Sequence, residues 1–514
     1  MAFLCQRRYD CSMIRKLFHR HDDAQLERYF VPVIIVGVLI AMGISLAIGL
    51  SQSVWFDEAY SIIVAKQPVN ELLHLTAVDT HPPLYYLLLK GWATLFGWSE
   101  LALRSLSVIA MGGAVAMGAL LVRRLFGLRA ALITLPFIVF APFLLRYGFE
   151  IRMYALASFM GVAATYILVR ALQARDRQEE LRLYLIYALL VAMGVYTLYY
   201  TVLLWLAHFA WLFWNTRREK KLVLKSPWFI AFCGSAALFL PWLPTFISQV
   251  GNGALAAISQ PLTIDNMAGI VSFMFVYQPA WQLSALTSLL VLFVIVAVSI
   301  LAVKAWVNTD RKQRTNLSLI VAYIMVPITI LALVSIAKPM YVERYLAHVL
   351  IAGSMFVGVV VALALAKKPS KKLMILGSGL LAAMLIGVIQ LAQVGNYNFQ
   401  RLQSPAIKQL ASTIDCARGT TVFAADPYVA IELDYYLPSC QIRFYSETVS
   451  LGGGYAPLSN NTLHVSDPTK ELANSRKVVY VYYDTQKLTM PSNLIESSSV
   501  SYGSLNAATY SAEK

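Results

Sequence analysis

Long apolar stretches alternate with short polar segments along most of the chain. A helix needs about 20 apolar residues to cross a bilayer, and eleven stretches approach or reach that length. They lie at about residues 31–50, 101–122, 130–146, 153–170, 183–199, 200–214, 228–247, 284–303, 317–336, 345–366 and 373–392. Two shorter stretches, 82–97 and 267–279, are predicted to lie on the membrane surface or to re-enter it. The pattern therefore predicts an all-α polytopic membrane protein with about eleven transmembrane helices.

The pattern changes after residue 392, where Ser, Asn, Asp and Tyr become frequent. Runs typical of strands at Thr420–Ala424 and Lys477–Tyr483 predict a small α/β domain. We expect three parts: a cytoplasmic tail at 1–30, a transmembrane module at 31–392 and an extracytoplasmic α/β domain at 393–514. Cys416 and Cys440 both fall in the last part, either as a disulfide or as two unpaired buried thiols.

The composition excludes a water-soluble enzyme. The 514 residues are 58% hydrophobic and only 13% charged, with a mean hydropathy of +0.62. The net charge of +15 does not require a nucleic-acid partner, because 26 of the 42 Lys and Arg residues fall in the N-terminal tail and alternate loops. Cytoplasmic loops keep such residues. The chain is therefore predicted to be an integral protein of the inner or plasma membrane, with a cytoplasmic N-terminus.

Carboxylates gather in the first outer loop, residues 51–100. Asp57 and Glu58 follow the first span directly, and adjacent carboxylates at a membrane surface are costly to bury without partners. Asp57 could take a proton from an acceptor hydroxyl. The alternative is structural, with Asp57 or Ser53 capping the short helix that follows.

Further polar residues stand at the same predicted side of the membrane. His81 precedes Pro82 and Pro83, where it could meet a phosphate or a metal, or serve as a hydrogen-bonded structural residue. Two outer turns carry arginines against the positive-inside trend. They hold Arg146, Glu150, Arg152 and Tyr154, and Lys338, Glu343, Arg344 and Tyr345. These arginines could bind a phosphate in a fork or form local ion pairs between helix ends.

Together these residues resemble the GT-C superfamily of polytopic glycosyltransferases, most closely its protein O-mannosyltransferase-like and aminoarabinose-transferase-like branch. The resemblance rests on four features in order. They are Phe56-Asp57-Glu58-Ala59, the stretch from His81 to Tyr86 followed by residues 97–104, Arg152 with Tyr154, and Glu343-Arg344-Tyr345-Leu346 before a soluble tail.

The resemblance implies roles for particular residues. Asp57 would be the catalytic carboxylate, and Glu58 would support the loop as the second member of the pair. His81 takes the place where aminoarabinose transferases carry a lysine. The candidates for binding the donor phosphate and substrate are His81, Arg146, Arg152, Tyr154, Arg344 and Tyr345, of which the resemblance implies His81, Arg152 and Arg344.

The function expected from this resemblance is inverting transfer of a sugar from a polyprenyl-phosphate donor to an acceptor hydroxyl, on the extracytoplasmic side. The acceptor is a glycan, a lipid or a protein. No cofactor is required, and a divalent cation held by Asp57 or His81 is left open. Two other functions stay open: a transporter or flippase of lipid-linked intermediates, and a non-catalytic envelope protein whose outer clusters are only ion pairs.

Overall fold

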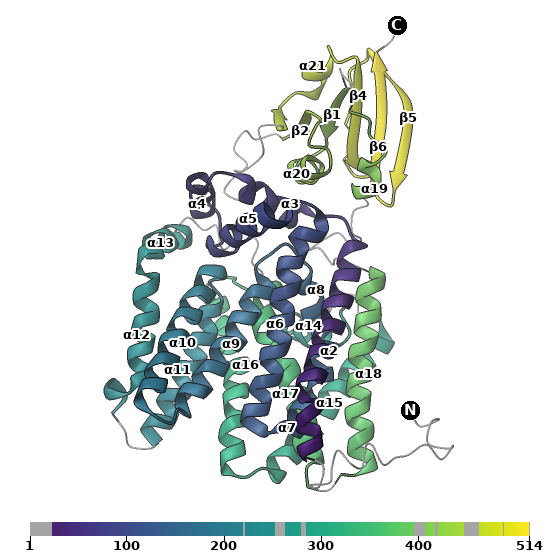
Figure 1. Ribbon diagram of the computed structural model, residues 1–514. Helices are drawn as coiled ribbons and strands as arrows, with labels where there is room; N and C mark the ends of the chain where they lie inside the picture. The colour runs from purple at the N-terminus through teal and green to yellow at the C-terminus, as the bar shows by residue number, and fades with distance from the viewer. Residues whose placement is uncertain are drawn as a thin grey trace.

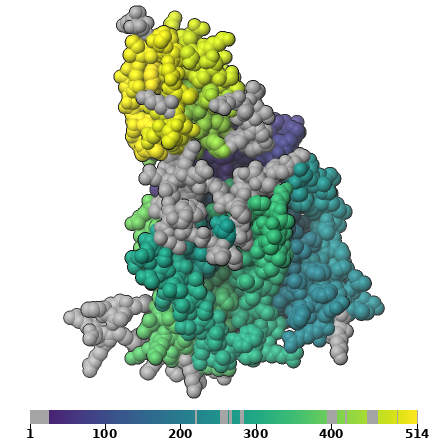
Figure 2. Space-filling model, turned by 180° about the vertical axis from the view of Figure 1, so that it is seen from behind, coloured from purple at the N-terminus to yellow at the C-terminus, as the bar shows by residue number. Residues whose placement is uncertain are grey.

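The computed structural model describes residues 23–218, 222–251, 263–278, 284–367, 369–394, 407–416, 420–446, 462–486 and 488–512. Figure 1 shows a bundle of long helices with a sheet-containing domain at one end. Between them lies a layer of three short helices, α3 (Phe56–Lys66), α4 (Val69–Val78) and α5 (Leu84–Phe96). The same order is visible from behind in Figure 2.

Every stretch predicted to span the bilayer forms a helix or a bent helix. They are α2 (Asp23–Leu50), α6 (Glu100–Phe126), α7 (Leu128–Val139) with α8 (Pro142–Gly148), α9 (Tyr154–Leu172), α10 (Arg177–Thr197), α11 (Thr201–Arg218), α12 (Pro227–Phe239) with η4 (Leu240–Trp242) and α13 (Leu243–Gly251), α15 (Ala285–Asn308), α16 (Arg311–Ala337), α17 (Ala347–Leu365) and α18 (Lys371–Val394). Within the described residues, nine helices are long and apolar enough to cross a membrane, or ten if the bent pair α7 and α8 counts as one. The stretch at 200–214 is outside that set because α11 ends in a polar turn with Arg217 and Arg218. The polytopic helical fold is confirmed.

The two shorter apolar stretches lie where short helices form. Residues 82–97 make α5, which packs on α3 and α6 within the layer of short helices. Residues 267–279 overlap α14 (Ile264–Phe275), which packs on α8 and α18. Short 3-10 turns, η3 (Val223–Lys225) and η7 (Glu343–Leu346), precede α12 and α17.

The centre of the bundle is α17, which is buried along almost its whole length. It packs against α7, α9, α15 and α16. Gly358 permits a close approach to α7, because a Cβ added there would lie 2.6 Å from the Cα of Thr134. Since both faces of α17 meet protein, its apolar residues are fixed by packing and not by lipid.

The bend between α7 and α8 measures 62°. Pro142 begins α8, a position that suits proline because the first helical N–H has no intrahelical partner. The chain that follows the bend runs to the layer of short helices, where the amide of Ile151 donates to the carboxylate of Glu58 in α3.

The C-terminal domain contains a six-stranded sheet in the order β3-β2-β1-β4-β6-β5. The strands are β1 (Thr420–Ala424), β2 (Ile442–Tyr445), β3 (Thr462–Val465), β4 (Lys477–Tyr483), β5 (Leu494–Tyr502) and β6 (Leu505–Ala512), and the helices are α19 (Ile407–Ala411), α20 (Pro427–Tyr436) and α21 (Pro468–Leu472). Strands β3, β2, β1 and β4 pair in parallel, while β6 runs antiparallel to both β4 and β5. The predicted α/β domain is confirmed, and the two strands expected from the sequence coincide with β1 and β4.

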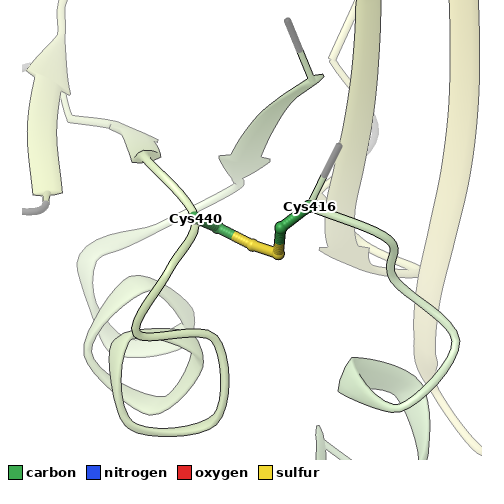
Figure 3. The surroundings of a disulfide bond; sticks show 2 residues. All are labelled: Cys416 and Cys440. Atoms are coloured by element: carbon green, nitrogen blue, oxygen red, sulfur yellow. A yellow bond between two sulfur atoms is a disulfide. The ribbon is translucent and has the colours of Figure 1, made fainter. Parts of the chain in front are cut away.

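A disulfide joins Cys416 to Cys440 across this domain, with their Cα atoms 5.3 Å apart (Figure 3). Cys440 is buried in the core beside Val422 and Ile442. Of the two alternatives left open by the sequence, the paired state is the one that the structure has. The bond ties the segment after α19 to the segment before β2.

Candidate active site

The chain between α2 and α3 places Asp57 and Glu58 in the first turn of α3. Trp55 is the residue at the N-cap position, and its amide donates to Glu58 Oε2 at 3.4 Å. The prediction that Asp57 or Ser53 caps this helix is therefore wrong. Ser53 Oγ instead accepts a hydrogen bond from the amide of Lys408 at 3.2 Å.

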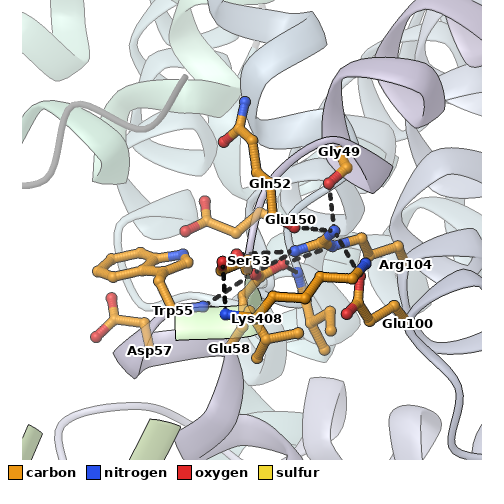
Figure 4. A network of polar contacts seen from close by, with 12 residues as sticks. Gly49, Gln52, Ser53, Trp55, Asp57, Glu58, Glu100, Arg104, Glu150 and Lys408 are labelled. Atoms are coloured by element: carbon orange, nitrogen blue, oxygen red, sulfur yellow. Dashed lines mark hydrogen bonds and ion pairs between the residues drawn. The ribbon is translucent and has the colours of Figure 1, made fainter. Parts of the chain in front are cut away.

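Glu58 forms a fully buried ion pair with Arg104 of α6, at 2.9 Å between Oε2 and Nη2 (Figure 4). The second oxygen, Oε1, accepts from Arg104 Nε at 3.3 Å and from the amide of Ile151 at 3.0 Å. A buried charge is tolerated only when it is paired and hydrogen-bonded in this way. Both oxygens of Glu58 are thus occupied by protein groups, so this carboxylate is a structural support.

Arg104 also fixes the connection between α2 and α3. Its guanidinium donates to the carbonyl oxygens of Gly49, Gln52 at 3.1 Å and Ser53 at 3.2 Å. These carbonyls lie at the end of α2 and just beyond it, where no intrahelical donor remains. One buried side chain therefore holds the backbone that leads to Asp57.

The carboxylate of Asp57 points to the other side of the α3 turn, away from the Glu58 network (Figure 4). Its Oδ2 lies 3.6 Å from Arg344 Nη2 and 3.9 Å from Arg152 Nε. Asp57 and Arg344 are only 13% and 9% exposed. Two turns that are distant in sequence thus supply cations to one carboxylate.

Arg152 is held by two helices of the layer of short helices. Its Nη1 donates to Ser61 Oγ at 3.2 Å and to Tyr86 Oη at 3.1 Å. Ser61 belongs to α3 and Tyr86 to α5, so both short helices orient this guanidinium. Its Nε is buried without a hydrogen bond within the described residues and faces Asp57.

His81 lies buried in the same cluster. Its ring meets Tyr345 edge-on, with the ring centres 5.6 Å apart. Burial, with Arg152 and Arg344 nearby, holds the pKa of His81 well below its usual value, because a further positive charge is disfavoured there. His81 is therefore a neutral imidazole at physiological pH.

Tyrosines complete the cluster. The ring of Tyr345 lies 6.3 Å from that of Tyr154 and 4.9 Å from that of Tyr200. In the part of the chain that the structure describes, the hydroxyls of Tyr154 and Tyr345 are buried and have no hydrogen-bond partner. Buried polar groups are normally paired, so these hydroxyls are free to bind a polar ligand.

Arg146 forms an ion pair with a carboxylate other than Asp57. It pairs with Glu150 at 3.3 Å, and its guanidinium lies over the rings of Tyr147 and Phe149. Burial raises the pKa of Glu150 although Arg146 opposes the change. The structure thus joins Asp57, His81, Arg152, Tyr154, Arg344 and Tyr345 in one cluster, and leaves Arg146 in a separate ion pair.

Asp79 belongs to the cluster but is absent from the candidates drawn from the sequence. Its carboxyl group is buried, and burial raises its pKa to about 6 against the opposing effect of Arg152. The signal in the sequence is a carboxylate two residues before His81, in a chain with only 27 acidic residues. Tyr86 is part of the stretch from His81 to Tyr86 but is not among the candidate site residues, since one tyrosine among 28 carries no signal of its own.

A close contact joins the end of α2 to the turn before Arg152. A Cβ added at Gly49 would lie 2.7 Å from the Cβ of Phe149. The backbone below Asp57 and the turn that carries Arg152 therefore touch directly, without room for a methyl group between them.

No metal centre is evident among the described residues, where no group of three or more His, Cys, Asp or Glu side chains could hold a metal ion. The two residues suggested as metal ligands, Asp57 and His81, have other neighbours. Asp57 faces two guanidinium groups, and His81 faces an aromatic ring.

Comparisons with known proteins bear on this arrangement. Residues 80–245 match a family model described as dolichyl-phosphate-mannose-protein mannosyltransferase. The structure of ArnT from Cupriavidus metallidurans bound to undecaprenyl phosphate is similar, with a TM-score of 0.61 and 13% identity, covering 95% of this chain and 98% of that one. The chain has the fold of the GT-C membrane glycosyltransferases.

Other comparisons agree with the GT-C fold. ArnT in the apo state gives a TM-score of 0.59 at 11% identity, covering 93% of this chain and 98% of that one. The oligosaccharyltransferase of Archaeoglobus fulgidus in the apo form gives 0.51 at 11% identity, covering 79% and 64%. No curated protein matches the sequence. The resemblance to the GT-C superfamily is thus confirmed for the fold, and the matched segment includes His81 and Arg152.

Proposed function

We propose that the chain is a membrane glycosyltransferase that moves a sugar from a polyprenyl-phosphate donor to a hydroxyl group of a glycan, lipid or protein, with inversion at the anomeric carbon. The observation that carries the proposal is the approach of Arg344 and Arg152 to Asp57, at 3.6 and 3.9 Å. One cluster then offers a proton acceptor and cations for a phosphate. The GT-C fold, shared with an ArnT that binds undecaprenyl phosphate, supports a lipid-phosphate donor.

In the proposed reaction, the acceptor oxygen bonds to the anomeric carbon while its proton passes to Asp57. The bond between that carbon and the phosphate oxygen breaks on the opposite face, and the phosphate leaves with the electron pair. Arg152 and Arg344 donate to the leaving oxygens, where fixed cations stabilise the developing charge. His81 contributes hydrogen bonding without charge, because it is neutral.

We further propose that this end of the bundle faces the extracytoplasmic side. Helix α6 begins at Glu100 beside the cluster and ends near Arg123 and Arg124, so its basic end is the far one. The first turns of α10 and α16, which begin at Arg177 and Arg311, and the loop before α18, with Lys367, are also basic and lie at that far end (Figure 1). Because cytoplasmic loops keep Lys and Arg, the cluster and the C-terminal domain are assigned to the outer face.

The transfer is proposed to need no metal. Two guanidinium groups within 4 Å of Asp57 Oδ2 already supply positive charge, and they would repel a divalent cation at the same oxygen. We expect treatment with EDTA to change the transfer rate by less than about twofold. If EDTA abolished sugar transfer and Mg²⁺ or Mn²⁺ restored it, this part of the proposal would be contradicted.

Asp57→Asn tests the function. Envelope glycans and glycolipids of a deletion strain, compared by mass spectrometry with those of the complemented strain, identify the transferred sugar. With that sugar on undecaprenyl phosphate as the donor, we expect purified Asp57→Asn protein to lose activity by about 100-fold or more. Asp176→Asn is the matched control, since Asp176 caps α10 far from the cluster and Asn caps equally well.

The same variants separate the other functions. If Asp57→Asn transferred sugar at the wild-type rate, Asp57 would not be the base. If the complemented strain gained no sugar but moved a lipid-linked intermediate across its membrane, the chain would be a flippase. If the deletion strain had unchanged glycans and moved lipid-linked intermediates across its membrane at an unchanged rate, the chain would be a non-catalytic envelope protein.

A further inference from the structure

The C-terminal domain contacts the segment that leads directly into Asp57. Helix α20 packs on α3, and the ring of Tyr428 lies 4.5 Å from that of Phe56, the residue before Asp57. The amide of Lys408, in α19, donates to Ser53 Oγ. The C-terminal domain thus contacts Ser53 and Phe56, and also Val54 through Tyr436, all of which lie just before the proposed base.

Tyr436, in the last turn of α20, makes the shortest of these contacts. Its hydroxyl accepts from the amide of Val54 at 2.7 Å and donates to Glu100 Oε1 at 3.0 Å. Val54 lies between two helices, so its amide has no helical partner of its own. The tyrosine therefore supplies a hydrogen bond that the connecting segment cannot make internally.

Glu100 extends the contact toward Glu58. Its Oε2 pairs with Lys408 Nζ at 3.0 Å and with Arg104 Nη1 at 3.5 Å. Arg104 in turn holds Glu58, the neighbour of Asp57, in the buried pair described above (Figure 4). A continuous set of polar contacts therefore runs from α20 through Glu100 and Arg104 to the first turn of α3.

We propose that the C-terminal domain positions Asp57 for catalysis, and that Tyr436 is the positioning residue through which it acts. The inference rests on the proposed function, since it presumes that Asp57 accepts the proton. The hydroxyl of Tyr436 bonds the amide of Val54 and the carboxylate of Glu100, so its role concerns where the carboxylate of Asp57 sits and not how the donor phosphate is held. The domain is then part of the catalytic apparatus, although it supplies no group to the reacting atoms.

Tyr436→Phe in the full-length protein tests the proposal. The variant keeps the ring and removes the hydroxyl that joins Val54 to Glu100. Tyr435→Phe is the matched control on the neighbouring residue, because the hydroxyl of Tyr435 donates to the carbonyl of Trp98 at 3.3 Å and not to the segment before Asp57. Both variants are purified and compared with the wild type.

We expect Tyr436→Phe to lower the maximal transfer rate by about tenfold, as expected for the loss of a buried hydrogen bond that holds a reacting group. Binding of undecaprenyl phosphate should stay within about twofold of the wild type, because the arginines are untouched. Tyr435→Phe should change neither quantity. A fall in binding with an unchanged maximal rate would overturn the proposal.

Amide hydrogen exchange gives a second measurement that does not depend on sugar transfer. In Tyr436→Phe, the amide of Val54 should exchange at least about tenfold faster, and exchange over residues 53–58 should rise with it. Tyr435→Phe should leave these amides as in the wild type. Unchanged exchange in Tyr436→Phe would overturn the positioning role, whereas failure of the wild type to transfer sugar would overturn the proposed function.

Discussion

The carboxylate of Asp57 lies 3.6 Å from the guanidinium of Arg344, a residue from the far end of the helical module's sequence. Asp57 lies in the first turn of α3, just after α2, and Arg344 lies in η7, just before α17. Both side chains are largely buried, so each is the other's counterion in a setting with little water. A substitution at either residue therefore changes the charge felt by the other.

Arg344→Lys should weaken binding of undecaprenyl phosphate by about tenfold. Lysine keeps the charge but cannot offer the planar fork that suits a phosphate. Isothermal titration of the purified protein in detergent would measure the change. Arg177→Lys, in an exposed pair with Glu180, is the control and should bind as the wild type does. Equal affinity in Arg344→Lys would exclude a forked phosphate contact at this position.

Glu58→Gln should lower the free energy of unfolding by about 3 kcal/mol, because it leaves the buried charge of Arg104 with only the more distant carboxylate of Glu100. Denaturant unfolding in detergent, followed by tryptophan fluorescence, would measure it. Glu471→Gln is a suitable comparison, since Glu471 is exposed on α21 and should change stability by less than about 0.5 kcal/mol. A stable but inactive Glu58→Gln protein would instead assign Glu58 a direct chemical role.

Asp79 should make donor binding depend on pH. Burial raises its pKa to about 6, so it is protonated below that pH and ionised above it. Protonation removes a negative charge beside Arg152, and an anionic donor should therefore bind more tightly as the pH falls through 6. The neighbouring Tyr60 and Tyr86 have raised pKa values and the pKa of His81 is lowered, so none of these changes charge in this range.

A phosphodiester donor such as undecaprenyl-phosphate mannose suits this measurement, because its own phosphate does not titrate near pH 6. We expect its affinity to rise by about fivefold between pH 7.5 and pH 5 in the wild type. In Asp79→Asn the affinity should equal the low-pH value at both pH values. If Asp79→Asn kept the full pH dependence, another group would be responsible.

Replacing both Cys416 and Cys440 with serine should lower the free energy of unfolding of the C-terminal domain by about 2–4 kcal/mol, because the disulfide links cysteines that are 24 positions apart in the sequence. Limited proteolysis at rising temperature would report on this domain. Cys233→Ser is the control, since Cys233 is a free, exposed cysteine of α12. Equal protease resistance in the double variant would show that packing alone holds the domain.

The fold could be predicted from the sequence because its determinants are local. Each apolar stretch can satisfy its own backbone by forming a helix, and so the helices follow from the hydropathy pattern. Strands β1 and β4 are likewise runs of apolar and β-branched residues that end at polar segments. Hydropathy alone does not predict bends: the apolar stretch that forms α7 and α8 turns by 62° near Pro142.

The cluster could be predicted only in part, because pairing is a tertiary property. Asp57, Arg152 and Arg344 stand at the same side of the membrane in the sequence pattern, and the structure brings them together. Hydropathy and position do not distinguish Arg146 from Arg152, yet one pairs with Glu150 and the other faces Asp57. The contact between Tyr436 and Val54 also could not be predicted, because no sequence pattern links the C-terminal domain to the segment before α3.

The contact between Gly49 and Phe149 has a consequence for related chains. Any side chain at residue 49 would push the aromatic ring aside and carry Arg152 away from the carboxylate that it faces. Homologues with alanine or serine at this position should therefore have a smaller residue than phenylalanine opposite it. Correlated substitutions at positions 49 and 149 would show that these two residues together keep the guanidinium of Arg152 close to Asp57.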